Sequence, residues 1–168
     1  MQLDRFDVSI LSALLRSGRA SHVELAEEVG LSATACARRQ KALEENGLIV
    51  GYEAVLGLTR LGLATTVMVR ITLDSQNEEA LKAFEQAVID CPSVVRCFLM
   101  SGSDDYWLTV LARDIQDFEH IHKTQLSRLP RVARIQSSFA MREIVNRSAP
   151  PAALAKAKAW RKGDDHPV

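Results

Sequence analysis

Two short helical patterns separated by one glycine, within residues 21–46, constrain the fold more than any other stretch of the chain. Ser21 and Glu24 have the spacing of a capping box, in which each side chain bonds an otherwise unpaired backbone N–H at a helix start. Gly30 stands where the end of a helix favours a residue with positive φ, and Ser32 can cap a second helix. Two helices joined by so short a turn predict a helix-turn-helix.

The second of these helices has the composition of a DNA-reading helix. Its first turn carries only small or hydroxyl side chains, which can enter a major groove about 12 Å wide without steric conflict. Its free N-terminal N–H groups can bind phosphate. An amphipathic hairpin whose basic face is merely solvated is the alternative that remains open. The predicted DNA contacts, with Arg38 first among them, are Ser32, Ala33, Thr34, Ala35, Arg38, Arg39 and Lys41.

Two polar positions on this helix are predicted to face inward. Cys36 lies on the apolar stripe and is interpreted as a core residue more readily than as a redox sensor. Gln40 lies four residues after Cys36 and three before Leu43. It must therefore find a hydrogen-bond partner or reach solvent.

The flanking segments complete an N-terminal domain of residues 1–56. A helix is predicted over Leu3–Leu15, with Asp4 as its cap and a broad apolar stripe. After Asn46-Gly47, the apolar run Leu48–Leu56 predicts a strand or wing. Residues 57–63, which contain two glycines, are interpreted as a hinge.

The second half of the chain has the two-residue alternation of half-buried strands. Strands are predicted over 66–73, 94–101, 106–113 and 133–141, with helices beginning after Ser75 and Asp114. The order βαββαβ predicts a ferredoxin-like sheet over residues 64–147 with helices on one face. The fold class is therefore α+β, a winged helix-turn-helix followed by this sheet domain.

Residues 148–168 form a basic C-terminal tail that contains Trp160 and four Lys or Arg residues. The tail is interpreted as a frayed, solubilising end. The alternative is a short helix that docks on a neighbouring subunit or touches DNA.

Composition limits the remaining possibilities. The formal net charge of the 168 residues is zero, so attraction to DNA must come from local patches. The chain has three cysteines, Cys36, Cys91 and Cys97, and no C-x-x-C motif. An odd number without this motif indicates neither a disulfide framework nor a zinc site. A reducing cytoplasm fits this usage. Neither a signal peptide nor an apolar run of membrane-spanning length is indicated, so no membrane partner is expected. No cofactor and no metal are predicted.

The chain resembles the Lrp/AsnC (leucine-responsive and asparagine regulator) family of transcription regulators over residues 1 to about 147. The resemblance implies dimers that pair through a strand over Ile49–Val55 and assemble further, commonly to octamers. It also implies a ligand-sensing sheet domain. It is carried jointly by LDRFDVSIL (3–11), ELAEEVGLSATAC (24–36), LEENGLIVGYEAVL (43–56), SGSDDYWL (101–108) and LSRLPRV (126–132).

The ligand that the resemblance implies is a free amino acid, bound between sensing domains near a Gly-x-x-Asp-Tyr hairpin. Backbone N–H groups at a glycine turn suit an α-carboxylate, and an aspartate suits an α-ammonium group. The alternative is a plain Asp/Gly-rich turn. Gln136 and Ser138 of the last strand are weaker candidates, because alternation alone does not settle which way they face. The predicted effector-binding residues are Gly102, Ser103, Asp104, Asp105, Tyr106, Gln136 and Ser138.

Two other functions compete with an amino-acid-responsive regulator. Siroheme decarboxylases resemble the same family and reuse its two-domain plan. His120 and His122, however, are two residues apart on a helix and point to different faces, and the basic reader helix favours DNA. A sensor or assembly module without DNA binding is the third interpretation. With no other catalytic motif in the chain, a non-enzymatic function is expected.

Overall fold

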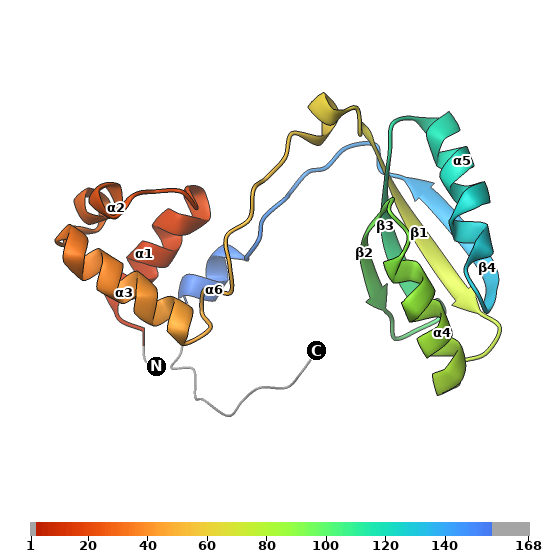
Figure 1. Cartoon of the computed structure of the whole chain (residues 1–168), viewed down its shortest axis with the longest axis horizontal. Coiled ribbons are helices and arrows are strands. Elements are labelled where there is room, and N and C mark those ends of the chain that lie inside the picture. Colours follow the sequence, from red (N-terminus) through yellow and green to blue (C-terminus); the bar gives the residue numbers. More distant parts are fainter. Residues whose placement is uncertain (1–2, 156–168) are drawn as a thin grey trace. The chain divides into compact units, whose positions relative to one another are not determined.

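The chain folds into two compact units (Figure 1). One unit comprises Met1–Val55 together with Val145–Val168, and the other comprises Leu56–Ile144. The computed structural model describes residues 3–155.

The first unit contains the three predicted N-terminal helices, α1 (Arg5–Arg16), α2 (His22–Val29) and α3 (Ala33–Glu45). The sequence placed their caps correctly. Asp4 caps α1 in a capping box with Asp7, and Ser21 caps α2 in a second box with Glu24. Between α2 and α3 the backbone turns at Gly30, whose φ of 75° lies in the left-handed region that glycine adopts without a Cβ clash.

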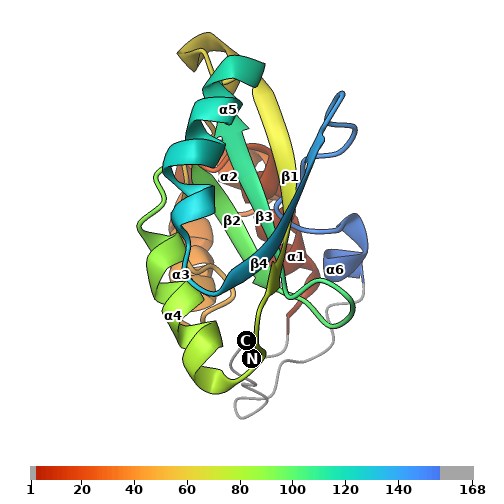
Figure 2. The same cartoon turned by 90° about the vertical axis from the view of Figure 1, so that its right-hand side faces the viewer.

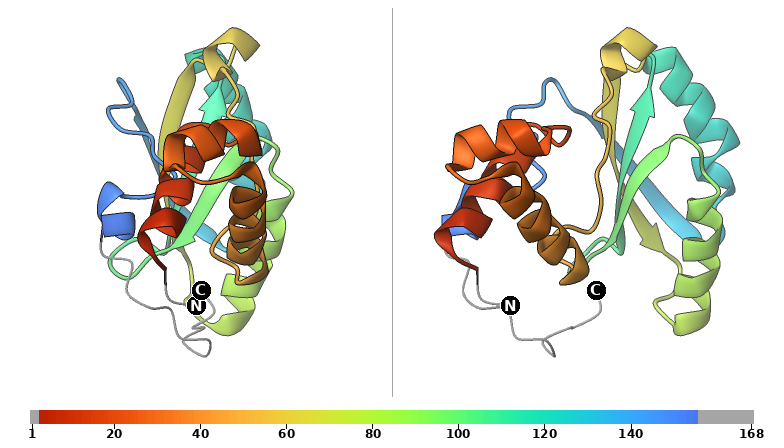
Figure 3. Two further views of the ribbon diagram at one scale, coloured as in Figure 1. Left: turned by 90° about the vertical axis from the view of Figure 1, so that its left-hand side faces the viewer. Right: turned by 60° about the vertical axis from the view of Figure 1, so that its left-hand side comes forward.

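One small core joins the three helices. α1 contributes three buried side chains at helical spacing, α2 contributes one and α3 contributes two, so the predicted helix-turn-helix closes on α1 (Figure 3). Cys36 is fully buried there, as predicted. The core residues are Ile10, Ala13, Leu14, Leu25, Cys36 and Leu43.

An ion pair fixes α3 against the beginning of α1. Arg39 donates a hydrogen bond from Nη1 to Asp7 Oδ1 at 2.7 Å, and the same atom lies 2.8 Å from Asp4 Oδ2. The guanidinium also lies over the Phe6 ring, 5.4 Å from its centroid. Arg39, predicted to contact DNA, is therefore bound by the capping residues of α1, because its position three residues after Cys36 turns it toward the core edge.

The segment after α3 differs from the predicted strand. Residues 50–57 have no regular secondary structure in the single chain, because no neighbouring strand accepts their hydrogen bonds. Tyr52 holds the start of this segment on α3: its Oη donates to Glu44 Oε1 at 2.7 Å and accepts from Gln40 Nε2 at 2.6 Å. The amide nitrogen of Gln40 therefore has the expected partners, whereas its buried Oε1 accepts no hydrogen bond from the described residues. The expected hinge contains a short 3₁₀ turn, η1 (Leu58–Leu61), which ends at Gly62 with a φ of 81°.

The second unit is a four-stranded antiparallel sheet with two helices. Its elements are β1 (Thr65–Leu73), α4 (Glu78–Ile89), β2 (Val94–Leu99), β3 (Tyr106–Ala112), α5 (Ile115–Thr124), a 3₁₀ turn η2 (Leu126–Arg128) and β4 (Val132–Phe139). The strand order β2-β3-β1-β4 confirms the predicted ferredoxin-like topology. Both helices cover the same face (Figures 1 and 2). The cap of α4 is Asn77, whose side chain accepts from Ala80 N, and not the expected Ser75.

The core of this unit lies between the sheet and its helices. Alternate residues of β1 and β3 are buried, which places Val67, Val69 and Ile71 on the helix-covered face. Their neighbours in sequence, Met68 and Arg70, lie on the opposite face, called here the open face. The predicted alternation of β1 is therefore confirmed.

The chain returns to the first unit at its end. Helix α6 (Pro151–Ala155) packs against α1 (Figures 1 and 3). The predicted basic tail thus contains a short element bound to the helical unit of its own chain. Trp160 and the four basic residues of the tail lie outside the described residues.

Replacing Arg39 by alanine should lower the free energy of unfolding by about 1–3 kcal/mol, because the buried Asp7 carboxylate loses its cationic partner. Arg38→Ala is the matched control. Arg38 is exposed, and its loss should change stability by less than about 0.5 kcal/mol. Urea unfolding followed by circular dichroism measures both variants. Equal stability of the two variants would contradict the structural role of Arg39.

Stability should also depend on pH through Asp4. Hydrogen bonds from the Asp7 and Phe6 backbone N–H groups, together with Arg39, lower the pKa of this carboxyl from its ordinary value of 3.8. The carboxylate therefore stabilises the fold above that ordinary value, and the contribution is lost as pH falls through the lowered pKa of the folded state. Asp4→Asn keeps a capping oxygen but does not titrate. Its urea midpoint should fall less steeply than that of the wild type on acidification below about pH 4; parallel curves would exclude this effect.

Candidate functional site

The exposed surface of α3 forms one stripe. Thr34, Arg38 and Lys41 are four and three residues apart, so they lie on the same side of the helix, and all three are exposed. Cys36 and Leu43 lie on the buried side. Lys41 Nζ lies 3.6 Å from Glu45 Oε1, one turn further on, and is otherwise directed to solvent. The stripe therefore presents a hydroxyl and two cationic side chains.

The first turn of α3 contains the remaining predicted contacts. Ser32 caps the helix by accepting from Ala35 N at 3.2 Å, and Ala33 and Ala35 are half-buried. No acidic residue lies in this turn. The positive end of the helix dipole is thus left without a neutralising carboxylate, which suits a phosphate oxygen.

The predicted effector residues separate onto the two faces of the sheet. Asp105 and Tyr106 belong to the helix-covered side. Asp105 Oδ2 accepts from Leu73 N, and its Oδ1 accepts from Gln76 Nε2, both at 2.7 Å. Tyr106 is buried and donates from Oη to Glu85 Oε1 at 2.7 Å, and burial raises the pKa of its phenol. Both side chains have their polar groups occupied within the fold.

Asp104 turns the other way. Its carboxylate is about nine-tenths buried at the rim of the open face, where Oδ2 lies 3.7 Å from Arg70 Nη1 and Oδ1 lies 3.7 Å from Arg134 Nη2. Gly102 and Ser103 form the exposed turn just before it, and Gly102 has a φ of 141°. The two adjacent aspartates of the hairpin therefore differ. Asp105 is bonded within the fold, whereas Asp104 faces the open side.

Strand pairing places the last two candidates beside Arg70. Gln136 of β4 pairs with Arg70, and Trp107 of β3 pairs with Arg70 from the other side. One step along the strands, Ser138 and Thr109 flank Met68 in the same way. Directly paired residues share a face, so Gln136 and Ser138 both lie on the open face.

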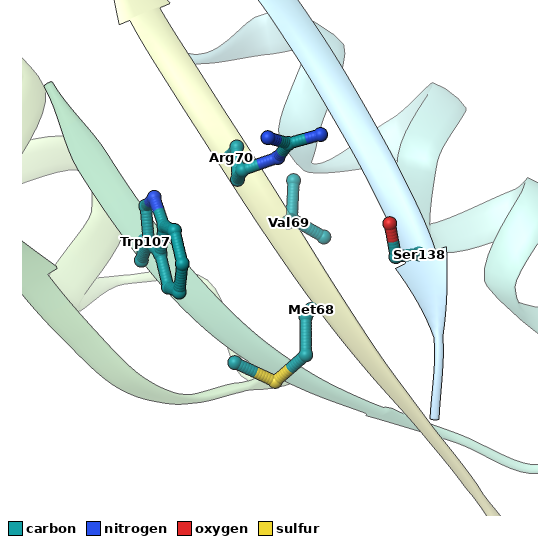
Figure 4. A pocket seen from close by; sticks show the side chains of 5 residues that line it. All are labelled: Met68, Val69, Arg70, Trp107 and Ser138. Carbon is teal, nitrogen blue, oxygen red and sulfur yellow. The ribbon is translucent and has the colours of Figure 1, made fainter. Parts of the chain in front are cut away.

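A shallow cavity of about 240 Å³ lies on this face (Figure 4). Sequence reasoning had not assigned Arg70, Met68 or Trp107 to a binding site. The alternation of β1 already separated Met68 and Arg70 from the core, but only the pairing register shows that Trp107 and Ser138 flank them. The cavity is lined by Met68, Val69, Arg70, Trp107 and Ser138.

The two sensing-domain histidines do not form a pair. His120 is exposed, whereas His122 packs its ring against Phe118 with centroids 6.2 Å apart. Within residues 3–155, three or more His, Cys, Asp or Glu side chains are nowhere grouped so that they could hold a metal ion. Over the same residues, each helix is too short or too polar to cross a membrane.

Comparison with known proteins accounts for both units. The family model for a winged helix-turn-helix DNA-binding domain matches residues 3–50, and the model for the Lrp/AsnC ligand binding domain matches residues 66–150. The Bkd operon transcriptional regulator of Pseudomonas aeruginosa is 42% identical over 150 residues, which cover 89% of this chain and 98% of that protein. The proline dehydrogenase transcriptional activator of Rhodobacter capsulatus is 40% identical over 88% of this chain and 96% of its own.

Solved structures agree with this comparison. A transcriptional regulator of Neisseria meningitidis in complex with L-Met has a TM-score of 0.83 and 34% sequence identity over 89% of this chain and 96% of that chain. An AsnC family regulator of Agrobacterium tumefaciens has a TM-score of 0.82, also at 34% identity, over 89% and 97%. The two-domain plan, the capped reader helix and the family matches together lead to one conclusion: the chain belongs to the Lrp/AsnC family of DNA-binding transcription regulators.

Proposed function

We propose that this regulator contacts DNA through the exposed stripe and the first turn of α3. The observation that carries the proposal is the position of Thr34, Arg38 and Lys41 on one exposed side of a helix whose other side is fixed in the core. Arg38 is assigned a base edge or a phosphate, and Lys41 a phosphate. Ser32, Ala33 and Ala35 bring the backbone N–H groups of the first turn to the sugar-phosphate chain. Arg39 acts indirectly, by holding α3 on α1.

The effector of this regulator is a free amino acid. The relative from Neisseria meningitidis was solved with L-Met, and the exposed turn at Gly102 and Ser103 leads directly to Asp104, whose carboxylate faces the open side. Gln136 and Ser138 lie on the same open face. Asp105 and Tyr106 support the site by fixing the hairpin. This division of roles explains how one short hairpin can serve both the fold and a ligand.

The working form is a homodimer that assembles further, with an octamer as the expected end state. Within the extended segment after α3, Val50 is 96% exposed and Val55 is 94% exposed. Apolar side chains so exposed on an unpaired strand-like segment suit pairing with the same segment of a second copy. Each added copy supplies another reader helix, which raises affinity for DNA with several sites.

The chain acts without catalysis, in the cytoplasm where chromosomal DNA is bound. Its relatives are named transcriptional regulators. His120 and His122, the residues that a decarboxylase of this plan would have to use, face different surroundings. The arrangement of α3 supports DNA binding more directly than it supports chemistry on a tetrapyrrole.

Replacing Arg38 by alanine should weaken binding to DNA from the protein's own upstream region by about 1–3 kcal/mol if it reads a base. If Lys41 contacts a phosphate, Lys41→Ala should reduce the salt dependence of log K by about one per chain. Mobility-shift titrations at several salt concentrations measure both effects. Lys123→Ala, an exposed lysine of the sheet unit, is the control. Unchanged binding by Arg38→Ala would show that α3 is not the reading element.

A screen of the twenty amino acids should reveal the effector as an increase in melting temperature. A ligand that binds only the folded state stabilises it by RT ln(1 + [L]/Kd), which is about 2.7 kcal/mol at a hundredfold excess over Kd. The matching amino acid should then change the mobility-shift pattern of the DNA complex. A flat screen, with DNA binding indifferent to all twenty, would remove the amino-acid effector while leaving the DNA-binding proposal intact.

A further inference from the structure

We infer that Tyr52, bound to Gln40 and Glu44 of α3, is a positioning residue for DNA reading. These three residues, called here the Tyr52 clamp, fix the point at which the chain leaves the reader helix. They thereby set the spacing at which the protein reads two half-sites. The inference rests on the proposed function, namely DNA contact through α3 and pairing of the extended segment with a second copy.

The clamp connects three parts of the helical unit. Tyr52 Oη donates to Glu44 Oε1 at 2.7 Å and accepts from Gln40 Nε2 at 2.6 Å. Its ring also lies close to the turn that follows α1, where a Cβ added to Gly18 would lie 4.0 Å from Tyr52 Cδ1. Partial burial and the Glu44 carboxylate raise the pKa of Tyr52, so its hydroxyl remains a donor at neutral pH. The segment after α3 is thus attached to both α3 and the end of α1.

The clamp and the Arg39 ion pair hold opposite flanks of α3. The midpoint between Cys36 and Leu43 marks the buried side of the helix. At 3.6 residues per turn, Arg39 lies about 50° to one side of this midpoint and Gln40 about 50° to the other. Arg39 is bound by the capping carboxylates of α1, and Gln40 by Tyr52. Rotation of α3 about its own axis is therefore opposed from both flanks, which fixes the direction of its exposed stripe.

Gln40 is a costly residue at its position. Its Oε1 is buried and accepts no hydrogen bond from residues 3–155, a loss that an apolar side chain would avoid. What the amide supplies, and an apolar side chain could not, is the donor to Tyr52. A local rule broken at a cost in stability is typical of a functional position, and here the gain is the attachment of the segment.

The backbone alone does not fix where the segment leaves α3. Residues 50–57 have no regular secondary structure, and Gly51, with the wide conformational freedom of glycine, comes directly before Tyr52. The two hydrogen bonds of Tyr52 supply the missing constraint. In two copies paired through this segment, the constraint acts once on each reader helix. Half-sites whose spacing matches the resulting separation then meet the second helix at the highest effective concentration.

The experiment measures the affinity of the full-length protein for three short duplexes. They contain one half-site, two half-sites at the preferred spacing, or the same two half-sites with five added base pairs. The half-site and its preferred spacing come from selection by the wild type from a randomised duplex pool. Five base pairs turn the second half-site by about half a helical turn. The wild type should bind the preferred spacing at least about tenfold more tightly than the lengthened duplex.

Tyr52→Phe is the test variant. It keeps the ring beside Gly18 and loses both hydrogen bonds of the hydroxyl, while Gln40 Nε2 retains Glu44 Oε1 at 3.3 Å. A less constrained segment accommodates both spacings, so the preference should fall to about threefold or less. Affinity for the single half-site should stay within about twofold of the wild type. Glu53→Gln changes the next, exposed residue and is the matched control, which should keep the wild-type preference.

Gln40→Met separates positioning from stability. Methionine fills the site without an unpaired buried oxygen, so the urea midpoint should equal or exceed that of the wild type. The donor to Tyr52 is nevertheless lost. The spacing preference should therefore fall between those of the wild type and Tyr52→Phe, because Tyr52 still donates to Glu44. A preference that instead follows the urea midpoint would contradict the inference.

Three further results would overturn it. The first is an equal spacing preference in Tyr52→Phe and the wild type, and the second is a wild type without any preferred spacing. The third is an equal loss of affinity by Tyr52→Phe for single and paired half-sites, which would make Tyr52 only a support of α3. Failure of the proposed function shows separately, as unchanged binding of the single half-site by Arg38→Ala.

Discussion

The register of β1 between its two neighbours is the constraint on which the sheet unit depends. β1 pairs with β3 on one side and β4 on the other, and a shift of one residue would exchange its two faces. Val67, Val69 and Ile71 would then leave the core, and Met68 and Arg70 would enter it. A buried arginine without its partner is strongly unfavourable, so the same alternation that builds the core keeps a cation on the open face. Fold and candidate binding surface are thus two results of one register.

In the helical unit, two residues likewise serve two purposes. Asp4 and Asp7 cap the start of α1 and also bind Arg39 of α3. Because the two carboxylates are fixed by backbone N–H groups, they are preorganised for the guanidinium. The orientation of α3 is therefore set from its interior side. Its opposite side, with Thr34, Arg38 and Lys41, stays exposed.

The sequence predicts local features well where one residue determines one conformation. The caps at Asp4, Ser21, Ser32 and Asp114, the turn at Gly30 and the alternation of β1 all follow from nearest neighbours in the chain. What it could not predict depends on distant partners. Arg39 is a plausible DNA contact by composition, and only its position opposite Asp7 shows that it is occupied. Asp104 and Asp105 are adjacent and chemically identical. They differ because the backbone turns Asp105 toward Leu73 N and Asp104 toward Arg70.

The same limit applies to the segment after α3. Its apolar run is typical of a strand, but a strand needs a neighbour, and no neighbouring strand pairs with residues 50–57 in the single chain. Tyr52 instead binds the first part of the segment to Gln40 and Glu44. A side-chain contact on α3 thus replaces the missing backbone partner at that point. Beyond it, Val55 stays exposed.

The return of the chain to its first unit affects the order in which the protein can be completed during synthesis. The core of α1, α2 and α3 uses residues up to Leu43, so it can close soon after these residues leave the ribosome. Helix α6, which packs on α1, is made only after the whole sheet unit, Leu56–Ile144, has been translated. At about 5–20 residues per second this delay is roughly 5–20 s. For that time the nascent helical unit exists with the α6-binding side of α1 uncovered, while the sheet unit is still being translated.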